Sequence, residues 1–422
     1  MEDLKGKKLL ISGGPALACD IVEKAREMGI YTIVTDWYEP EVSIAKNISD
    51  EYRMVSTADI DAMVDLSRKE KVDGVFTQYT DSNLPYCQQI CEKLGFYFCA
   101  NRYQLDQISN KENAKNLCIK HGIPVPEKYS VTNAFDEEEL NAIKYPVLTK
   151  PVDNSGQRGI SICNNEEELK EGFVIAEANS ERKEVLVEQY LKGDYVVICF
   201  TIQEGKLYLS AMADKPVIPE KYSNGLVRLP MGYVLPSKYI DKFYEEEFEK
   251  FKKLVEFLDL KNGSLGVEAI VSDGKFYVFE MQYRLGGMKH HSFVLEENGF
   301  DIMKMHIQYA LTGKFGDESI EGKNNPYFRN TYYLLNLLLK DGTICKIDGI
   351  EEMLEIPEVY NFLPMHKIGD SIEITGSVMQ IFGKVNIKAG SREELKRVLD
   401  LINKNVHIYD ENGDEMLLDL IM

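Results

Sequence analysis

Two acidic residues lie in a segment that otherwise has the pattern of two short apolar strands, residues 266–287, GVEAIVSDGKFYVFEMQYRLGG. Glu268 and Glu280 fall in the two apolar runs, and a Ser-Asp-Gly turn signal separates these runs. An unpaired carboxylate inside an apolar strand costs on the order of several kcal/mol, whereas a hard cation such as Mg²⁺ binds carboxylate oxygens favourably. The segment therefore predicts a hairpin that holds a divalent metal ion. An ordinary hairpin with one salt-bridged glutamate is the alternative.

The turn of this hairpin decides whether the two glutamates share a face. A two-residue Asp273-Gly274 turn would place them on opposite sides, by strict alternation. A three-residue loop, 272–274, would pair Val271 with Lys275 and make the glutamates diagonal neighbours, roughly 7–8 Å apart. Because a shared metal ion requires the second register, we expect that one. The same face would then carry Gln282 and Arg284.

The size and composition of the chain limit the classes of protein to which it can belong. With 422 residues, 44% of them hydrophobic and 28% charged, it should form two to four soluble globular domains. No apolar run reaches the roughly 18–20 residues of a membrane span, and the first residues are no signal peptide, so we expect a cytoplasmic protein. The net charge of −20 argues against nucleic-acid binding. The eight cysteines include no CxxC pair and are expected to be reduced thiols.

The first hundred residues alternate short apolar runs with helical segments, a pattern typical of a parallel α/β sheet. Gly13-Gly14 follows the first run, and Asp36 lies about twenty residues further on, which suggests a dinucleotide site. However, the sequence Gly-Gly-Pro-Ala-Leu-Ala lacks the GxGxxG spacing, and no P-loop occurs anywhere in the chain. The strands are expected at 8–12, 32–36, 72–77 and 96–99.

Two lysines have positions that suit phosphate binding. Ser109 and Glu112 have the spacing of a capping box, which would place Lys111 in the first turn of a helix. A cation is unfavourable there, and this hints at an anionic partner. Lys150 ends an apolar run and precedes the polar, glycine-containing loop 153–159, whose backbone N–H groups could cover a phosphate. Taken singly, each signal is weak, because first-turn lysines are common and the loop could belong to a plain hairpin.

Four motifs in order resemble the ATP-grasp superfamily, in its carboxylate–amine ligase branch near biotin carboxylase and the L-amino-acid ligases. They are the helix that opens with Lys111, YPVLTKPVDNSGQRG, VEQYLKGDY and the GVEAIV…FEMQYRLGG segment. The resemblance covers nearly the whole chain and implies an α/β and α+β multidomain fold. Its expected parts are an N-terminal parallel α/β pre-ATP-grasp domain at 1–108, a two-lobed ATP-grasp domain at 109–325 with a lid at about 125–190, and a carboxylase-like α+β domain at 326–422.

The resemblance also implies roles for individual residues in ATP binding. Lys111 and Lys150 would contact the phosphates, and a hinge between the two lobes would meet adenine and ribose. Glu268 and Glu280 would hold Mg²⁺, one or two ions, with Mn²⁺ as a possible substitute. Gln282 stands where the family usually has Asn, which makes a second metal site less certain than the first. The remaining predicted nucleotide contacts are Ser155, Gly156 and Gly159 in the loop, Glu188, Gln189 and Leu191 in the hinge, and Asp194.

Further residues are predicted to contact the substrates. The resemblance places Arg284 beside the acyl phosphate or carboxylate, and Lys215 in reach of the same place. Asp81 follows an expected strand at its carboxyl end, where ligand sites of α/β sheets gather. The GGMKHH segment directly after the metal strand is expected to line the acceptor pocket. Its candidates are Gly287, His290 and His291, with buried structural histidines as the alternative.

These features together predict an ATP-dependent ligase. ATP would convert a small carboxylate, with an amino acid favoured, into an acyl phosphate that an amine attacks, giving ADP and phosphate. No nucleophilic side chain is required, which agrees with the lack of a Ser/His/Asp or Cys/His constellation. A carboxylase or carbamoyl-phosphate-type enzyme that uses bicarbonate, and a nucleotide-binding regulator without catalysis, are the alternatives. A homodimer is implied by the resemblance alone, and the sequence does not identify the acid or the amine.

Overall fold

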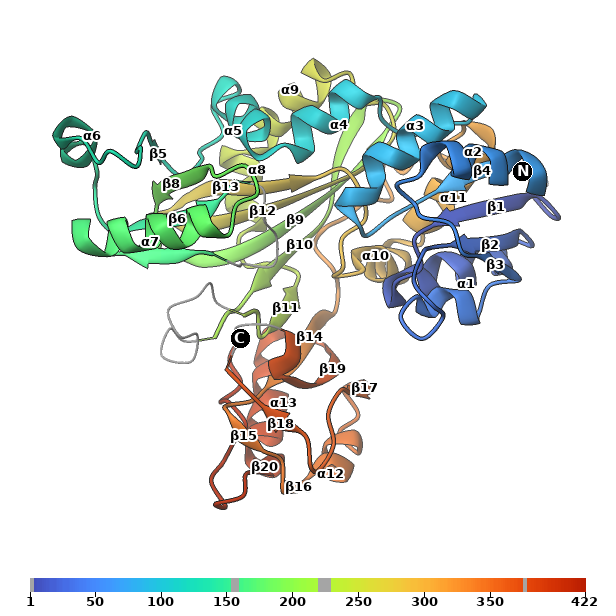
Figure 1. The fold of residues 1–422 in the computed structure, drawn as a ribbon. Helices are drawn as coiled ribbons and strands as arrows, with labels where there is room; N and C mark the ends of the chain where they lie inside the picture. The colour runs from blue at the N-terminus through green and yellow to red at the C-terminus, as the bar shows by residue number, and fades with distance from the viewer. Residues whose placement is uncertain (1–3, 153–158, 219–228, 375–377) are drawn as a thin grey trace.

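The computed structural model describes residues 4–152, 159–218, 229–374 and 378–422. Its N-terminal part is a parallel four-stranded sheet in the order β3-β2-β1-β4, with helices packed around it, as the alternation predicted (Figure 1). Ligand sites of such sheets lie where the strand order reverses, here between the carboxyl ends of β1 and β4. The strands are β1 (Lys8–Ser12), β2 (Tyr31–Thr35), β3 (Glu51–Arg53) and β4 (Gly74–Phe76), and the helices are α1 (Cys19–Glu27), α2 (Ile60–Glu70) and α3 (Leu84–Leu94), with short 3-10 turns η1 (Ala16–Ala18), η2 (Ile44–Asn47) and η3 (Asp81–Asn83).

The strand predicted at 96–99 is wrong. Helix α3 ends at Gly95, which has a left-handed conformation with φ of 71°. The next amide, that of Phe96, donates to the carbonyl of Cys91 and thereby closes the helix. An apolar run that follows a helix in this way is packed as a connection and does not pair with β4.

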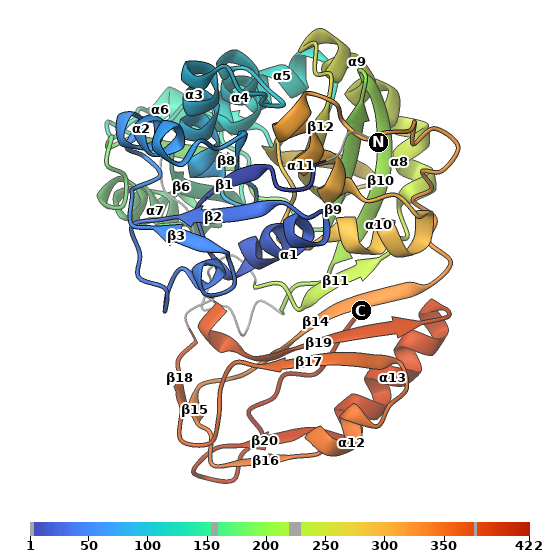
Figure 2. The same ribbon diagram turned by 90° about the vertical axis from the view of Figure 1, so that its right-hand side faces the viewer.

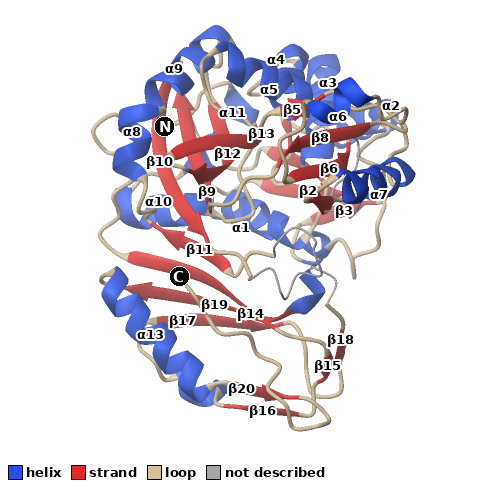
Figure 3. Ribbon diagram, turned by 90° about the vertical axis from the view of Figure 1, so that its left-hand side faces the viewer, coloured by secondary structure: helices blue, strands red, loops and turns tan. Residues whose placement is uncertain are grey.

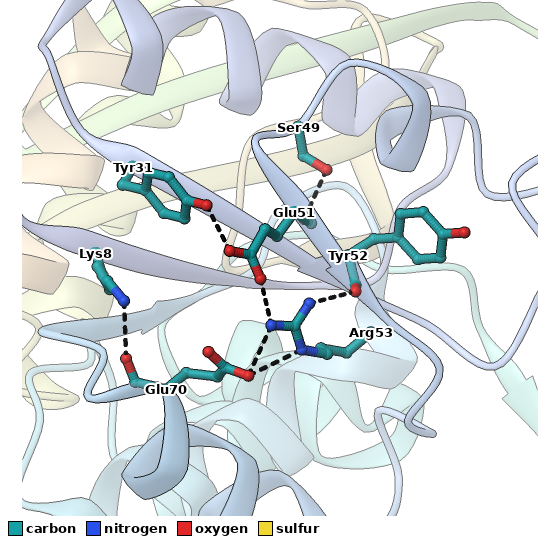
Figure 4. Close-up of polar contacts among 7 residues, drawn as sticks. All are labelled: Lys8, Tyr31, Ser49, Glu51, Tyr52, Arg53 and Glu70. Carbon is teal, nitrogen blue, oxygen red and sulfur yellow. Dashed lines mark hydrogen bonds and ion pairs between the residues drawn. The ribbon is translucent and has the colours of Figure 1, made fainter.

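The edge of the N-terminal sheet is held by polar contacts around the short strand β3 (Figure 4). The hydroxyl of Tyr31 donates to Glu51 at 2.6 Å, and the guanidinium of Arg53 lies between Glu51 and Glu70, with its Nε 2.9 Å from Glu70. Lys8 donates to the main-chain carbonyl of Glu70 at 3.2 Å. These contacts fix β3 against α2, and they lie apart from the candidate site described below.

A long sheet of eight strands forms the centre of the molecule, in the order β13-β12-β9-β10-β11-β14-β19-β17. It is antiparallel and continues from the central part of the chain into the C-terminal part through the pairing of β11 with β14 (Figure 2). Helices α8 and α9 cover one face, where Phe200 packs against Phe243 and Phe251. The strands are β9 (Asp194–Gln203), β10 (Lys206–Lys215), β11 (Gly232–Leu235), β12 (Gly263–Ser272), β13 (Lys275–Gln282), β14 (Thr331–Leu338), β17 (Val359–Pro364) and β19 (Ile381–Ala389), and the helices are α8 (Ile240–Glu246), α9 (Phe248–Phe257), α10 (His290–Asn298) and α11 (Ile302–Thr312).

A smaller sheet with α7 on one face projects beside the central sheet, at the left of Figure 1. Its order is β5-β8-β6-β7, and its core includes Val147, Leu169 and Phe173. Asn165 caps α7 by accepting from the amide of Glu168 at 3.0 Å. The elements are β5 (Lys128–Tyr129), β6 (Val147–Pro151), β7 (Ser161–Cys163), β8 (Val185–Gln189), α6 (Glu137–Asn141) and α7 (Glu166–Ala178).

Two helices connect the N-terminal sheet to the centre, α4 (Arg102–Ser109) and α5 (Lys111–Lys120). The capping box predicted from Ser109 is wrong, because Ser109 is the last residue of α4. Asn110 caps α5 and accepts from the amides of Glu112 and Asn113 at 3.0 and 3.1 Å. Helix α4 also crosses the proposed boundary at 108, and Leu105 packs in the core of the central sheet.

The C-terminal part adds two small two-stranded sheets and two helices to the end of the eight-stranded sheet (Figure 3). Ser391 caps α13 by accepting from the amide of Glu394 at 3.1 Å. None of the helices in the described ranges is long and apolar enough to cross a membrane. The elements are β15 (Gly342–Thr343), β16 (Lys346–Asp348), β18 (Ser371–Ile372), β20 (His407–Tyr409), α12 (Ile350–Leu354), α13 (Arg392–Asn405) and η5 (Val378–Gln380).

Candidate active site

A cavity of about 550 Å³ lies between α5, the small sheet and one face of the central sheet. One part of its lining is apolar, with side chains such as Leu148, Ile162 and Met281. The other part carries charged groups from seven different elements. Such a mixed cavity suits a ligand with a flat apolar portion and an anionic portion. The charged lining residues are Asp81, Lys111, Lys115, Lys150, Glu188, Lys215, Glu268 and Glu280.

The hairpin of β12 and β13 places both predicted metal ligands at this cavity, but in a different register from the one predicted. Ser272 pairs with Lys275 across a two-residue turn, in which Asp273 and Gly274 have φ of 46° and 76°. Positive φ at both positions is typical of a type I′ turn. A β-bulge then shifts the pairing between Glu268 and Ala269, so that Glu268 lies directly opposite Glu280.

The bulge explains why the predicted three-residue loop is wrong. Strict alternation from a two-residue turn would separate the two glutamates, and the bulge inserts the one extra residue, Phe279, that brings them together. Phe279 lines the cavity, with its ring centroid 6.2 Å from that of Tyr195. A bulge beside a ligand cavity re-aims side chains, and here it aims two carboxylates at one place.

The electrostatics around these acids favour a cation. Burial raises the pKa of Glu280, and the charges of Glu268 and Asp81 raise it further, while two lysines oppose the shift. The side chain of Glu280 is exposed to solvent in the cavity, and the protein atoms that form the cavity wall around it cause its desolvation. Lys215 donates to Glu268 at 2.6 Å. Burial alone would favour neutral Lys215, but the nearby carboxylates outweigh it, and the net effect raises the pKa of this lysine.

These residues fit a magnesium ion. Mg²⁺ commonly takes one or two carboxylates and completes its shell with water and phosphate oxygens. Among the residues that the structure describes, no group of three or more His, Cys, Asp or Glu side chains is arranged around one point for a metal ion. Two opposed acids therefore suit a cation shared with a phosphate ligand. The amide of Gln282 lies 3.3 Å from Glu280 Oε1, within reach of the same place.

A second charged group lies where α5 meets the small sheet. The buried carboxylate of Glu188 on β8 forms ion pairs with Lys115 of α5 and with Lys150 of β6, the latter at 2.7 Å. Burial lowers the pKa of Lys150 to about 8, with a further contribution from Lys111. Burial and the charges of the neighbouring lysines lower the pKa of Lys115 to about 6. Two buried lysines share one carboxylate here, and an added anion would favour the protonated form of both.

Lys115 has no role in the sequence-based predictions. It lies one helical turn after Lys111, so both side chains lie on one face of α5, and both line the cavity. The i, i+4 spacing of two lysines after a helix cap was the signal that could have revealed it. Lys111 drew attention because of its unfavourable place in the first turn, whereas a lysine at mid-helix is usually solvated.

Five of the nine predicted nucleotide contacts line the cavity, two lie outside its lining, and two fall outside the described residues. Asp194 lies outside the lining, where its carboxylate accepts from Tyr239 and pairs with Lys238, each at 2.6 Å. Gly159 also lies outside the lining, and the predicted contacts Ser155 and Gly156 fall outside the described residues. The predicted nucleotide and metal residues in the lining are Lys111, Lys150, Glu188, Gln189, Leu191, Glu268 and Glu280.

Arg284 lies behind the cavity and joins two parts of the chain. Its guanidinium binds both carboxylate oxygens of Asp81, with Nε 2.8 Å from Oδ1, and its Nη1 donates to the carbonyl of Leu285 at 3.0 Å. Asp81 lines the cavity and follows β4, whereas Arg284 follows β13. This bidentate pair places an acid from the N-terminal sheet beside the glutamates of the central hairpin.

The predicted acceptor residues lie further from the cavity. His290 is fully buried, its pKa is lowered by burial to about 3, and within the described chain neither ring nitrogen has a hydrogen-bond partner. His291 is buried with its Nε2 3.8 Å from Asp20 of α1. Gly287 is exposed, close to Leu17. These residues pack α10 against the N-terminal part and do not line the cavity.

An antiparallel sheet, a smaller sheet beside it and a cavity between them, lined by opposed glutamates and by lysines, form a two-lobed arrangement. The family described as an ATP-grasp domain matches residues 108–288. Residues 108–288 are therefore similar to an ATP-grasp domain, in agreement with the resemblance predicted from the motifs.

Solved structures and curated relatives are similar to the chain over different extents. An L-amino acid ligase from Bacillus licheniformis has a TM-score of 0.79 at 20% identity, covering 97% of this chain and 100% of that one. A phosphoribosylglycinamide synthetase from Anaerococcus prevotii has a TM-score of 0.72 at 20% identity, covering 96% and 100%. A formate-dependent phosphoribosylglycinamide formyltransferase from Wolinella succinogenes is 26% identical over 47% of this chain and 51% of its own length. The match thus spans about half the length of that relative.

Proposed function

We propose that this protein is an ATP-dependent ligase that joins a small carboxylate to an amine through a C–N bond. The γ-phosphoryl group of ATP would pass to the carboxylate, and the amine would displace phosphate from the resulting acyl phosphate. The observation that carries this proposal is one cavity with opposed Glu268 and Glu280 at one place and the lysine group around Glu188 at another. ATP with Mg²⁺ would match both places, because the metal ion would bind the two glutamates and the phosphates would bind the lysines.

The residues would act by binding and by electrostatic positioning. Lys111, Lys115 and Lys150 would neutralise phosphate oxygens, and the apolar lining would hold the adenine against the hinge at Gln189 and Leu191. Mg²⁺ between Glu268 and Glu280 would offset the negative charge as two anions approach. Positioning of this kind accounts for the catalysis of phosphoryl transfer without a side-chain nucleophile.

Lys215 would serve as a fixed cation in this chemistry. Its pKa is raised, so it stays protonated at neutral pH and cannot act as a general base. Its place beside Glu268 suits a developing charge on the transferred phosphoryl group. Arg284 would hold Asp81 at the edge of the cavity, and either residue could meet the charged groups of the substrate.

The finer features of the proposal concern substrates and assembly. An amino acid is the favoured carboxylate, supported by the similarity to an L-amino acid ligase over nearly the whole chain. One Mg²⁺ is proposed at the two glutamates, a second with Gln282, and Mn²⁺ as a substitute. We retain the domain boundaries 1–108, 109–325 and 326–422 and a cytoplasmic homodimer as proposals. His290, His291 and Gly287 would shape the acceptor side indirectly, through the packing of α10.

A bicarbonate-dependent carboxylase is the second candidate. It is supported by a match of 23% identity over 72% of this chain to the 2-oxoglutarate carboxylase small subunit of Hydrogenobacter thermophilus. The site chemistry would be the same, since bicarbonate is also a carboxylate-like acceptor of phosphate. The two candidates differ in which acid ATP activates.

The test is phosphate release from ATP, measured over pairs of amino acids and other small acids and amines, with and without bicarbonate. A ligase releases phosphate only when acid and amine are both present, or slowly with the acid alone, and the product mass shows the new C–N bond. If phosphate release depends on bicarbonate, the carboxylase is favoured over the ligase. Nucleotide binding without turnover under any pair would favour a regulator. Glu280→Gln, measured in parallel, is the control for activity that does not use this site.

A further inference from the structure

Asp214 is a buried carboxylate at the end of β10, one residue before Lys215. Three donors converge on it, and none of them comes from a residue that lines the cavity. Ser237 donates its hydroxyl at 2.5 Å, Lys238 its amide at 3.3 Å, and Arg392 its Nη2 at 2.6 Å. The charge of this buried acid is thus matched by an arginine from the C-terminal part of the chain.

The place of Arg392 is not explained by the helix that carries it. Arg392 is the first residue of α13, directly after the cap Ser391. A cation in the first turn opposes the helix dipole, so the position is locally unfavourable. Its guanidinium also donates to the carbonyl of Pro236 at 2.6 Å, and it therefore holds both β10 and the segment after β11.

The neighbouring residue on β10 is part of the candidate active site. Side chains alternate along a strand, so Asp214 and Lys215 lie on opposite faces. Lys215 reaches Glu268 at 2.6 Å and lines the cavity, and it is also the last residue of β10. Lys215 pairs with Tyr195 of β9, whereas the register of β10 with β11 is the single pair Asp214 with Val234, so an anchor at Asp214 limits the movement of Lys215 on that side.

We propose that Arg392 is a positioning residue, which through Asp214 fixes the end of β10 and so holds Lys215 against Glu268. The inference rests on the proposed function for its link to catalysis. The C-terminal part of the chain would then contribute to the chemical step without reaching the cavity. A displacement of about 1 Å in a catalytic group can cost about 100-fold in rate, so loss of this anchor should be visible in kcat.

The experiment compares Arg392→Gln with a matched control, Lys388→Gln. Lys388 on β19 forms another ion pair between the C-terminal part and the rest of the chain, to Glu296 of α10, and does not touch β10. We expect Arg392→Gln to lower kcat about ten-fold or more with KM for ATP changed less than about three-fold, and Arg392→Lys to recover part of the loss. Lys388→Gln should leave both constants within about two-fold.

Hydrogen exchange of the backbone supplies a readout that does not depend on turnover. Exchange of the amides of 210–215 should be faster in Arg392→Gln than in Lys388→Gln, with equal exchange elsewhere in the sheet. If Arg392→Gln does not fold, Asp214→Asn, which keeps the bond from Ser237, takes its place in both measurements.

Each outcome decides one of the two proposals. Equal kinetic constants and equal exchange for Arg392→Gln and Lys388→Gln would overturn the positioning role. A wild-type protein without turnover would end the proposed function, and the exchange measurement would still decide whether Arg392 anchors β10. A parallel loss in kcat and in ATP affinity would show a general structural effect and would also overturn the inference.

Discussion

Nucleotide binding should take up a proton at alkaline pH because Lys150 is buried among other cations. Burial and the charge of Lys111 lower the pKa of Lys150 to about 8 in the free protein. Phosphate oxygens placed beside its ammonium would raise that pKa again, towards or above the ordinary value near 10.4. Above pH 8 the free protein loses this proton, and binding of ADP must restore it.

The magnitude follows from linkage. Each proton taken up weakens binding about ten-fold per pH unit, or roughly 1.4 kcal/mol. Between pH 8 and 9.5 the contribution of Lys150 should therefore lower the affinity for Mg-ADP about 15-fold, or roughly 1.6 kcal/mol. The phosphates of ADP, with a pKa of about 6, are already ionised in this range and contribute nothing to the slope.

Titration calorimetry in two buffers of different ionisation enthalpy measures the proton number directly. We expect this number to rise by about one between pH 7 and pH 9.5, because free Lys150 loses its proton in this range. Lys150→Met should abolish the difference, while Lys170→Met, which removes an exposed lysine paired with Glu166 on α7, should preserve it. An affinity that stays constant from pH 8 to 9.5, or the same proton number in Lys150→Met, would refute the reasoning.

Replacing Lys115 by Met should weaken ADP binding about ten-fold, as measured by calorimetry. Thermal melts should show little change in Tm, because Glu188 keeps its ion pair with Lys150. An unchanged affinity for ADP would exclude Lys115 from the phosphate site. Glu280→Gln should lower kcat by about 100-fold or more and remove most of the Mg²⁺ dependence of binding. The pKa of Glu280 is raised, so ionisation of this side chain destabilises the folded protein as the pH rises. In urea unfolding, Glu280→Gln should therefore be more stable than the wild type at pH 7 and should lose this advantage near pH 4. Phe200→Ala should cost about 3–5 kcal/mol in the same assay, because Phe200 is fully buried among aromatic rings; a cost below about 1 kcal/mol would contradict this packing.

The sequence allowed the fold class and the similarity of residues 108–288 to an ATP-grasp domain to be predicted, because the motifs are local and the periodicities are strong. Within the site it allowed the two glutamates to be chosen but not their register. The bulge at Phe279 depends on how β12 pairs on both of its edges, and no feature of the turn residues reveals it. Lys115 was missed because its partner, Glu188, is distant in sequence and close only after folding.

Local signals also failed where two of them overlapped. Ser109 and Asn110 are both good helix caps, and the choice between them depended on the preceding helix α4, whose own capping box joins Asn101 and Gln104. The apolar run at 96–99 had the composition of a strand, yet the closure of α3 took its first amide. Both errors come from the competition of neighbouring elements for the same backbone groups.

The pairing of β11 with β14 makes the C-terminal part inseparable from the nucleotide-binding part. The two strands are joined by four consecutive antiparallel residue pairs, from Gly232 with Leu335 to Leu235 with Tyr332. A chain cut at residue 325 would leave the outer side of β11 without a neighbour, and such open edges recruit strands from other molecules. Exchange of residues 326–422 as a module would break this sheet, so we expect new specificities in this protein to arise by substitution and by loop insertion.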